Sequence, residues 1–206
     1  MGGRRLLLAS RNGKKLAELQ RVVDGAGIVG LTVVGLDAVP AYPEEPETGA
    51  TFEENALIKA RAGARATGLA CLADDSGIAV DALNGMPGVL SARWSGRHGD
   101  DAANNDLLCN QLCDVPDERR GGGFVSACAL VLPDGTETVV RGEWRGSILR
   151  DGRGVNGFGY DPLFVPDDDI AAGRSAAELS PHEKDSLSHR AKALAQLVPA
   201  LRALVD

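Results

Sequence analysis

The sequence predicts an α/β fold built on a mixed β-sheet, and three features of the chain lead to that prediction. Short apolar runs alternate with segments in which apolar residues recur every three to four positions, as strands alternating with amphipathic helices do. Two later apolar runs, residues 124–132 and 138–148, flank the turn sequence Pro133-Asp134-Gly135 and predict a hairpin. The 26 glycines and 10 prolines are spread along the chain, which favours tight turns in a folded protein over disorder.

Strand and helix patterns alternate through the first half of the chain. Asn12 stands where an N-cap residue would begin the first helix, and Thr51-x-x-Glu54 has the spacing of a capping box. Several prolines precede that box, which indicates a loop. The expected order is a strand at residues 6–9, a helix at 13–26, a strand at 31–36, a loop at 40–50 and a helix at 55–66.

The second half adds further strands, two loops rich in glycine and a final helix. Asp100 and Asp101 favour a helix start, whereas Pro199 would kink or split the last helix. The length of 206 residues indicates one domain over residues 1–206, with room for two lobes. We expect a strand at 70–75, a short strand at 78–83, a structured loop at 84–99, a helix at 100–113, a turn at 116–123, the hairpin, a glycine-rich loop at 151–161 and a helix at 188–204.

Composition and charge exclude several classes of protein. Hydrophobic residues make up 44% of the chain, which is enough for a sizeable core. A formal net charge of −7 argues against binding nucleic acid through its phosphate backbone, although a local basic pocket could still take a small anion. The apolar run near the N-terminus is too short for a signal peptide, and no stretch is long enough to span a membrane. We therefore expect a soluble cytoplasmic protein with no nucleic-acid or membrane partner.

The four cysteines follow the pattern of buried thiols. Cys71 and Cys128 lie in apolar runs, where a free thiol behaves as a small hydrophobic side chain. None of the four forms a Cys-x-x-Cys pair, and no histidine lies at zinc-finger spacing. Neither disulfides nor a zinc site is expected.

Two adjacent carboxylates, Asp74 and Asp75, close an apolar run and are followed by Ser76 and Gly77. Carboxylates at the end of a buried strand need a cation or hydrogen-bond partners, because removing their charge from water is costly. Successive side chains of a strand point to opposite faces, so we expect only one of the two to enter a given cleft. Alternation does not say which one, and a solvated turn is the alternative interpretation.

The sequence Ser10-x-Asn12-x-x-Lys15 lies between a predicted strand and a predicted helix. Backbone N–H groups at a helix start attract phosphate, the side chains of Ser10 and Asn12 can hydrogen-bond to phosphate oxygens, and Lys14 or Lys15 adds positive charge. The segment is not a P-loop, because Gly-x-x-x-x-Gly-Lys is missing. The alternative is that Asn12 only caps the helix and the lysines are solvated.

A second candidate set joins the next predicted helix to the acidic loop before it. Asn55 and Lys59 are four residues apart and share one helix face, so Lys59 could meet a polyphosphate from a second side. Magnesium binds one or two carboxylates together with phosphate oxygens. Asp75 could supply one carboxylate, and the other could come from Glu44, Glu45 or Glu47. A solvated helix face and a solvated acidic loop are the alternatives.

The segment Gly157-Phe158-Gly159-Tyr160-Asp161 is the most distinctive part of the later glycine-rich loop. A phenylalanine between glycines offers a ring face on which a base can stack, with backbone free to approach it. The alternative is a turn with one buried aromatic ring. Near the last helix, donors for a phosphate or for the carbonyl edge of a base come from Lys184, Ser188, His189 and Arg190, although His189 alone would be structural.

Together these segments resemble the inosine triphosphatase family, the pyrophosphatases of non-standard purine nucleoside triphosphates, and its bacterial branch in particular. The resemblance covers nearly the whole chain, from Leu7 to Arg202. One departure is Asn156, which stands where the family commonly has glycine. This difference affects the expected shape of the loop and not the expected activity. The matching motifs, in order, are residues 10–15, 47–59, 73–77, 91–96 and 157–161, and Lys184 followed by Ser188-His189-Arg190.

The resemblance implies an elongated α/β structure in which a long mixed central sheet is flanked by helices, with an active-site cleft between two lobes, and it implies a homodimer. By matching position, Asp75 takes the metal-linked acid/base role and Glu47 is a second acid near Mg²⁺. The implied substrate contacts are Ser10, Asn12, Lys15 and Lys59 on the triphosphate, Ser76 on the substrate, Phe158, Gly159, Tyr160 and Asp161 around base and sugar, and Lys184, His189 and Arg190 on the base.

The implied reaction is hydrolysis of ITP, dITP or XTP to the monophosphate and pyrophosphate, which clears these nucleotides from the pool. Magnesium neutralises phosphate oxygens while a carboxylate activates the attacking water. A 6-oxo group accepts hydrogen bonds where the 6-amino group of adenine donates them, so donors in the site disfavour adenine. Two rival functions stay open: a phosphatase of another metabolite that uses Asp75 as a metal ligand, and a nucleotide-binding module without catalysis.

Overall fold

The computed structural model describes residues 3–168 and 172–205 of the chain, which divides into two compact units. Unit 1 comprises Met1–Asp75, Ser126–Gly142 and Arg190–Asp206, and unit 2 comprises Ser76–Val125 and Glu143–His189. Both units are discontinuous in sequence, because three long strands contribute residues to each of them.

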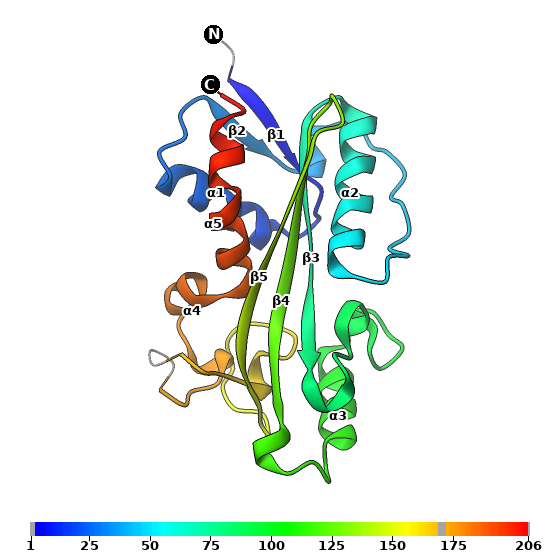
Figure 1. Ribbon diagram of the computed structural model, residues 1–206, viewed down its shortest axis with the longest axis vertical. Helices are drawn as coiled ribbons and strands as arrows, with labels where there is room; N and C mark the ends of the chain where they lie inside the picture. Colours follow the sequence, from blue (N-terminus) through cyan, green and yellow to red (C-terminus); the bar gives the residue numbers. More distant parts are fainter. Residues whose placement is uncertain (1–2, 169–171, 206) are drawn as a thin grey trace. The chain divides into compact units, whose positions relative to one another are not determined.

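In the part of the chain that the structure describes, six strands form one sheet in the order β2-β1-β3-β4-β5-β6. Figure 1 labels β1 to β5. Strand β1 pairs in parallel with β2 and with β3, whereas β5 and β6 are antiparallel. The mixed sheet predicted from the sequence is therefore confirmed. The strands are β1 Arg4–Leu8, β2 Leu31–Val34, β3 Ala70–Val80, β4 Gly121–Val131, β5 Glu137–Ile148 and β6 Phe164–Pro166.

Among the residues that the structure describes, five α-helices accompany the sheet, and those of the first half lie close to where the sequence places them. Within the described residues, no helix is both long and apolar enough to cross a membrane. The helices are α1 Gly13–Gly25, α2 Phe52–Thr67, α3 Asp101–Gln111, α4 Pro181–Leu187 and α5 His189–Arg202. Short 3-10 turns lie at Leu36–Ala38, Asp81–Leu83, Gly88–Arg93, Asp117–Arg119, Asp161–Leu163 and Ala176–Glu178.

In unit 1, helices α1 and α5 cover one face of the sheet and α2 covers the other (Figure 1). Leu6 and Leu8 of β1 point toward α1 and α5, where they join a buried apolar cluster. Leu7 points the opposite way because side chains alternate along a strand. On that side α2 packs closely at Gly63, where an added Cβ would lie 2.4 Å from Cys71 Sγ and 3.3 Å from Leu7 Cδ2.

Unit 2 has its own apolar core, built around aromatic rings. The ring of Phe164 on β6 meets Phe124 at a centroid distance of 4.9 Å and Trp144 at 5.4 Å, both edge to face. Leu108 of α3 is fully buried in the same cluster. Trp144 is also fully buried, and its indole N–H donates to Asp168 Oδ2 at 2.5 Å. A separate core on each unit satisfies the main requirement of a compact folding unit.

Strand β3 is longer than the sequence predicts, since it continues through Gly77 where two separate strands were expected. Glycine acts here by its small size rather than as a strand breaker. An added Cβ on Gly77 would lie 2.3 Å from Ser91 Oγ and 2.6 Å from the carbonyl oxygen of Gly88. Ser91 Oγ accepts a hydrogen bond from the N–H of Ile78 at 2.9 Å, so the close approach of Ser91 to Gly77 allows a hydrogen bond to the next residue of β3.

Two further differences concern the last third of the chain. Pro199 was expected to kink or split the last helix; α5 continues through it, so the split does not occur, and the N–H of Ala203 bonds to the carbonyl of Pro199 at 3.1 Å. The short strand β6 and the seven-residue helix α4 were not predicted from the sequence. Helix α4 begins with a full capping box between Ser180 and Glu183, a pattern that is visible in the sequence.

Candidate functional site

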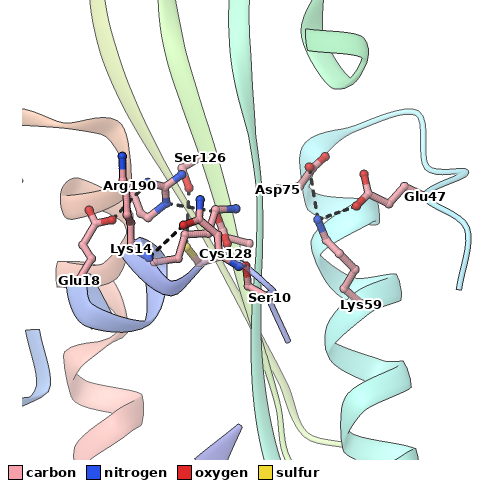
Figure 2. Close-up of polar contacts among 12 residues, drawn as sticks. Ser10, Lys14, Glu18, Glu47, Lys59, Asp75, Ser126, Cys128 and Arg190 are labelled. Atoms are coloured by element: carbon pink, nitrogen blue, oxygen red, sulfur yellow. Dashed lines mark hydrogen bonds and ion pairs between the residues drawn. The ribbon is translucent and has the colours of Figure 1, made fainter. Parts of the chain in front are cut away.

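The two neighbouring aspartates of β3 point to opposite faces of the sheet, as strand alternation predicts. Asp74 faces α1 and α5, where its partners are Lys15 and Arg190. Asp75 faces α2, where its partners are Asn55 and Lys59. Figure 2 shows Arg190 on one side of β3 and Asp75 with Lys59 on the other. Unit 1 therefore holds two adjacent carboxylates in two different environments.

The Asp74 side is a buried network of charges. Lys15 Nζ lies 2.8 Å from Asp74 Oδ2, and Arg190 Nε lies 3.2 Å from the same oxygen. Arg190 also donates from Nη1 to Glu18 Oε2 at 3.2 Å. Glu18, Asp74 and Arg190 are each less than 9% exposed. Two positive and two negative groups thus share this side, and Lys15 contacts Asp74 rather than Asp75.

Charge pairing decides the ionisation of this network. Burial raises the pKa of Asp74, but the positive charges of Lys15 and Arg190 outweigh it and hold that pKa well below its usual range. For Arg190, burial lowers the pKa, and the carboxylates of Asp74 and Glu18 more than reverse the effect. Asp74 is therefore a permanently ionised anchor, which is unsuited to accept a proton.

On the other face of β3, Lys59 lies between two carboxylates (Figure 2). Its Nζ is 3.0 Å from Glu47 Oε1 and 3.4 Å from Asp75 Oδ1. Asn55 completes the group, because its Nδ2 donates to Asp75 Oδ2 at 3.1 Å while its Oδ1 accepts from the N–H of Gly49 at 2.8 Å. Helix α2 thus supplies both side chains that hold Asp75, at the i, i+4 spacing predicted from the sequence.

The environment of Asp75 makes it the more basic of the two aspartates. Burial raises its pKa, Lys59 opposes that rise, and the negative charge of Glu47 adds to it, so the pKa of Asp75 lies above its usual value. Burial lowers the pKa of Lys59, but the negative charges of Asp75 and Glu47 raise that pKa by more than burial lowers it, so the ammonium stays charged. A partly buried carboxylate with a raised pKa is suited to general-base chemistry.

The acidic loop places one glutamate at this site and turns two away from it. Glu44 pairs with Arg11 at 2.7 Å, and Glu45 pairs with Arg65. Glu47 shares Lys59 with Asp75. Of the three candidates left open by the sequence, Glu47 is thus the one that stands beside Asp75.

The donor set around Lys59 fits magnesium bound together with phosphates. In the described part of the chain, no group of three or more His, Cys, Asp or Glu side chains is arranged to hold a metal ion. Magnesium does not need such a cage, because it takes one or two carboxylates and completes its shell with water and substrate phosphate. Glu47 and Asp75 already direct two carboxylate oxygens at one cation, the Lys59 ammonium.

The loop between β1 and α1 uses its polar side chains to begin the helix. Asn12 Oδ1 accepts from the N–H of Lys14 at 2.9 Å, which is the N-cap geometry, and Ser10 Oγ accepts from the N–H of Asn12 at 3.2 Å. The capping role of Asn12 is therefore confirmed. Lys14 is exposed, whereas the Lys15 side chain is 20% exposed and turned to Asp74. The start of this 13-residue helix thus lies beside Lys15, and the N–H groups of Lys14 and Lys15 are bonded to the side chain and the carbonyl oxygen of Asn12.

In unit 2, the loop around Phe158 is shaped by two glycines and one buried carboxylate. Gly157 and Gly159 adopt φ values of +80° and +60°, which side chains rarely allow. Asp161 is 1% exposed, and its Oδ2 accepts from the N–H of Phe158 at 2.8 Å and pairs with Lys184. The Lys184 ammonium lies 4.6 Å from the centroid of the Phe158 ring, which is itself 48% exposed.

The other residues expected to contact substrate are held by different elements of the structure. Tyr160 is buried, and its hydroxyl donates to the carbonyl of Ser91 at 2.9 Å. His189 stacks on Phe124 with a centroid distance of 5.0 Å and an angle of 15° between the rings. Ser76 follows Asp75 directly in β3 and is partly buried. Asn156 is tied down, since its Nδ2 donates to the carbonyl of Leu179 at 3.2 Å.

Sequence reasoning missed the network on the Asp74 side. Asp74 and Glu18 were not assigned a role, although both are buried partners of Arg190. Asp74 and Arg190 are 116 positions apart, so no local pattern links them. The one local signal was the unusual pair of carboxylates at the end of an apolar run, which required a nearby positive charge.

Comparison with known proteins gives consistent matches over nearly the full length. The sequence profile of the Ham1 family matches residues 6–200. A protein from Nocardia farcinica named dITP/XTP pyrophosphatase is 70% identical over 202 residues, covering 98% of this chain and 97% of that protein. The crystal structure of a nucleoside-triphosphatase, or dITP/XTP pyrophosphatase, from Mycobacterium abscessus is 66% identical, with a TM-score of 0.81, covering 96% of this chain and 99% of that one. A HAM1 protein structure from Coxiella burnetii is 40% identical, with a TM-score of 0.86 and coverage of 97% and 99%.

Proposed function

Because the chain belongs to the Ham1 family, we propose that it hydrolyses dITP, ITP and XTP to the nucleoside monophosphate and pyrophosphate. The observation that carries the proposal is the group formed by Glu47, Lys59 and Asp75, in a chain 70% identical to a protein named for this activity. Two carboxylates and a lysine at one point suit a reaction in which a polyanion is bound and split by water.

We assign the triphosphate to residues of unit 1. Lys59 and Lys15 supply positive charge, and the start of α1, where the helix dipole favours an anion, lies beside Ser10 and Asn12. Lys15 is paired with Asp74 at 2.8 Å, so in this proposal the phosphates compete with Asp74 for its ammonium. Before substrate arrives, Asp74 keeps the Lys15 side chain in place, which lowers the entropic cost of binding.

We assign the chemical step to Asp75. Asn55 and Lys59 hold its carboxylate in one orientation, in which it can accept a proton from the attacking water. Magnesium bound with Glu47 and Asp75 would neutralise phosphate oxygens and so ease attack by water. The Lys59 ammonium can then move from the carboxylates and stabilise the negative charge that forms on the leaving pyrophosphate. No covalent intermediate is needed.

We assign the base and sugar to the loop of unit 2 that carries Phe158. The Lys184 ammonium lies over one face of the ring, so a stacking base uses the opposite face. Donors near the ring favour a 6-oxo purine, because the 6-amino group of adenine would leave a donor facing a donor. The proposed contacts of this set are Phe158, Gly159, Tyr160, Asp161, Lys184, His189 and Arg190, with Ser76 as a further substrate contact.

The remaining parts of the proposal concern organisation. We propose a single functional domain over residues 1–206, a homodimer and a cytoplasmic enzyme without nucleic-acid or membrane partners. The net charge of −7 supports the absence of a nucleic-acid partner, because phosphate backbones need a basic surface.

A panel of nucleotides tests the proposed function. Release of pyrophosphate and monophosphate is measured with XTP, ITP, dITP, GTP and ATP, with and without Mg²⁺. We expect magnesium-dependent pyrophosphate release from the first three and much less from ATP. Orthophosphate as the first product would support a phosphatase of another kind, and binding without turnover would support a nucleotide-binding module.

A further inference from the structure

Helix α3 holds both backbone hydrogen-bonding groups of one loop residue, Gly159. Asp101 Oδ2 accepts from the N–H of Gly159 at 2.7 Å, and Asn105 Nδ2 donates to its carbonyl oxygen at 3.0 Å. Asp101 and Asn105 are four positions apart, so they project from one face of the helix. We call this pair of contacts the α3 clamp. All of its residues belong to unit 2.

The clamp acts on the residue that directly follows Phe158. This residue, Gly159, has a φ of +60°. Phe158 as a residue is 48% exposed, so much of its surface is not packed against the protein. The N–H of Phe158 is held by Asp161, and the clamp holds the next residue along the chain. Two consecutive N–H groups are thus tied to carboxylates from two different elements.

The helix that provides the clamp is itself firmly anchored. Leu108 of α3 is fully buried in the core of unit 2. Asn104 Oδ1 accepts from the N–H of Ser95 at 2.7 Å, which ties the helix to the preceding loop. Asp101 is the first residue of the helix, where the dipole favours a negative charge. The clamp therefore couples the position of α3 to that of the glycine-rich loop.

We propose that Asp101 and Asn105 are positioning residues for base selection, an inference that rests on the proposed function of the Phe158 loop. Neither residue is proposed to touch the substrate. Stacking alone accepts any base, because every base has a π face. Discrimination between a 6-oxo and a 6-amino purine depends on where the ring holds the base relative to the surrounding donors. Loss of the clamp lets the ring shift, so the 6-oxo substrate loses alignment.

The test compares four variants with the parent enzyme. Asp101→Ala and Asn105→Ala each remove one half of the clamp. Asp101→Asn is the rescue variant, because an amide oxygen can still accept from the N–H of Gly159. Asp106→Ala is the matched control, since Asp106 is an exposed carboxylate on the same helix. For each protein, kcat and KM are measured with XTP and with ATP, together with the rate of amide hydrogen exchange at Gly159.

We expect the two clamp deletions to lower the ratio of kcat/KM for XTP over ATP by about five- to tenfold, the size of one net hydrogen bond. The loss falls mainly on KM for XTP, while kcat at saturation stays within about twofold. Exchange at Gly159 becomes faster in Asp101→Ala and stays slow in Asp101→Asn. The rescue variant and the Asp106→Ala control keep the parent ratio.

The possible failures are distinguishable. A parent enzyme that selects XTP, with clamp variants that keep the same ratio, overturns this inference and leaves the proposed function intact. A parent enzyme without base preference overturns the proposed function and the inference with it. If Asp101→Ala does not fold, Asn105→Ala decides the question in the same assay.

Discussion

Asp74 and Asp75 are chemically identical neighbours that receive opposite properties from their surroundings. Buried charges are stable only when they are paired, and the two aspartates are paired with different residues. Lys15 and Arg190 lower the pKa of Asp74, whereas burial and the negative charge of Glu47 raise that of Asp75. Strand alternation predicted the opposite directions of the two side chains from the sequence. The partners themselves come from distant parts of the chain and are set by the fold.

Replacing Asp74 tests its structural role. Asp74→Asn leaves Arg190 and Lys15 without the anion that neutralises them, so we expect the free energy of unfolding to fall by about 3–5 kcal/mol. Urea unfolding followed by circular dichroism measures the loss, with Asp106→Asn as an exposed control on α3. An Asp74→Asn variant as stable as the control would contradict the role of the network.

The cysteines give a second test at this scale. Cys71 and Cys128 are fully buried, as predicted, and burial raises the pKa of each thiol to about 12. Since the thiolate is the reactive form, both are expected to resist iodoacetamide at pH 8 in the folded protein, while the exposed Cys113 reacts first. Peptide mass spectrometry after timed labelling identifies the modified residues. Early labelling of Cys71 or Cys128 would mean that the core opens readily.

At the scale of elements, patterns in the sequence located most helices and strands but misread how some of them end. The helix predicted at residues 13–26 is α1, and the hairpin around Gly135 is formed by β4 and β5. Gly77 was interpreted as a break because glycine usually weakens a strand. In the structure, the absence of a side chain at Gly77 leaves room for Ser91, which follows it by 14 positions. This contact has no local signal in the sequence. The three residues of β6 are too few to show an alternating pattern.

The close approach at Gly77 can be measured. In Gly77→Ala the new Cβ would meet Ser91 Oγ and the backbone of Gly88, so we expect a loss of about 1–3 kcal/mol in unfolding free energy. Gly25→Ala is the control, because an added Cβ there meets nothing within 4 Å. Thermal unfolding of both variants provides the measurement. Equal stability of the two would show that β3 can move away from Ser91 at no cost.

For the whole molecule, the sequence predicted the class of fold, and resemblance to a family supplied the roles of the site residues. The structure adds the information on which residues contact one another. It joins Glu47, Lys59 and Asp75 in unit 1, and Phe158, Asp161 and Lys184 in unit 2. The choice of Glu47 among three glutamates depends on the path of a loop, because Glu44 and Glu45 are drawn to arginines. Such long-range pairings follow from the fold and have no sequence spacing of their own.

The central claim is that Asp75 assists the chemical step rather than only holding the substrate. Turnover and affinity of the Asp75→Asn variant test it most directly, with kcat measured from pyrophosphate release with XTP and Kd from a non-hydrolysable analogue. We expect kcat to fall by about 100-fold or more, the usual contribution of a general base, while Kd changes by less than about fivefold. A variant whose kcat stays within about threefold of the parent value would contradict the claim.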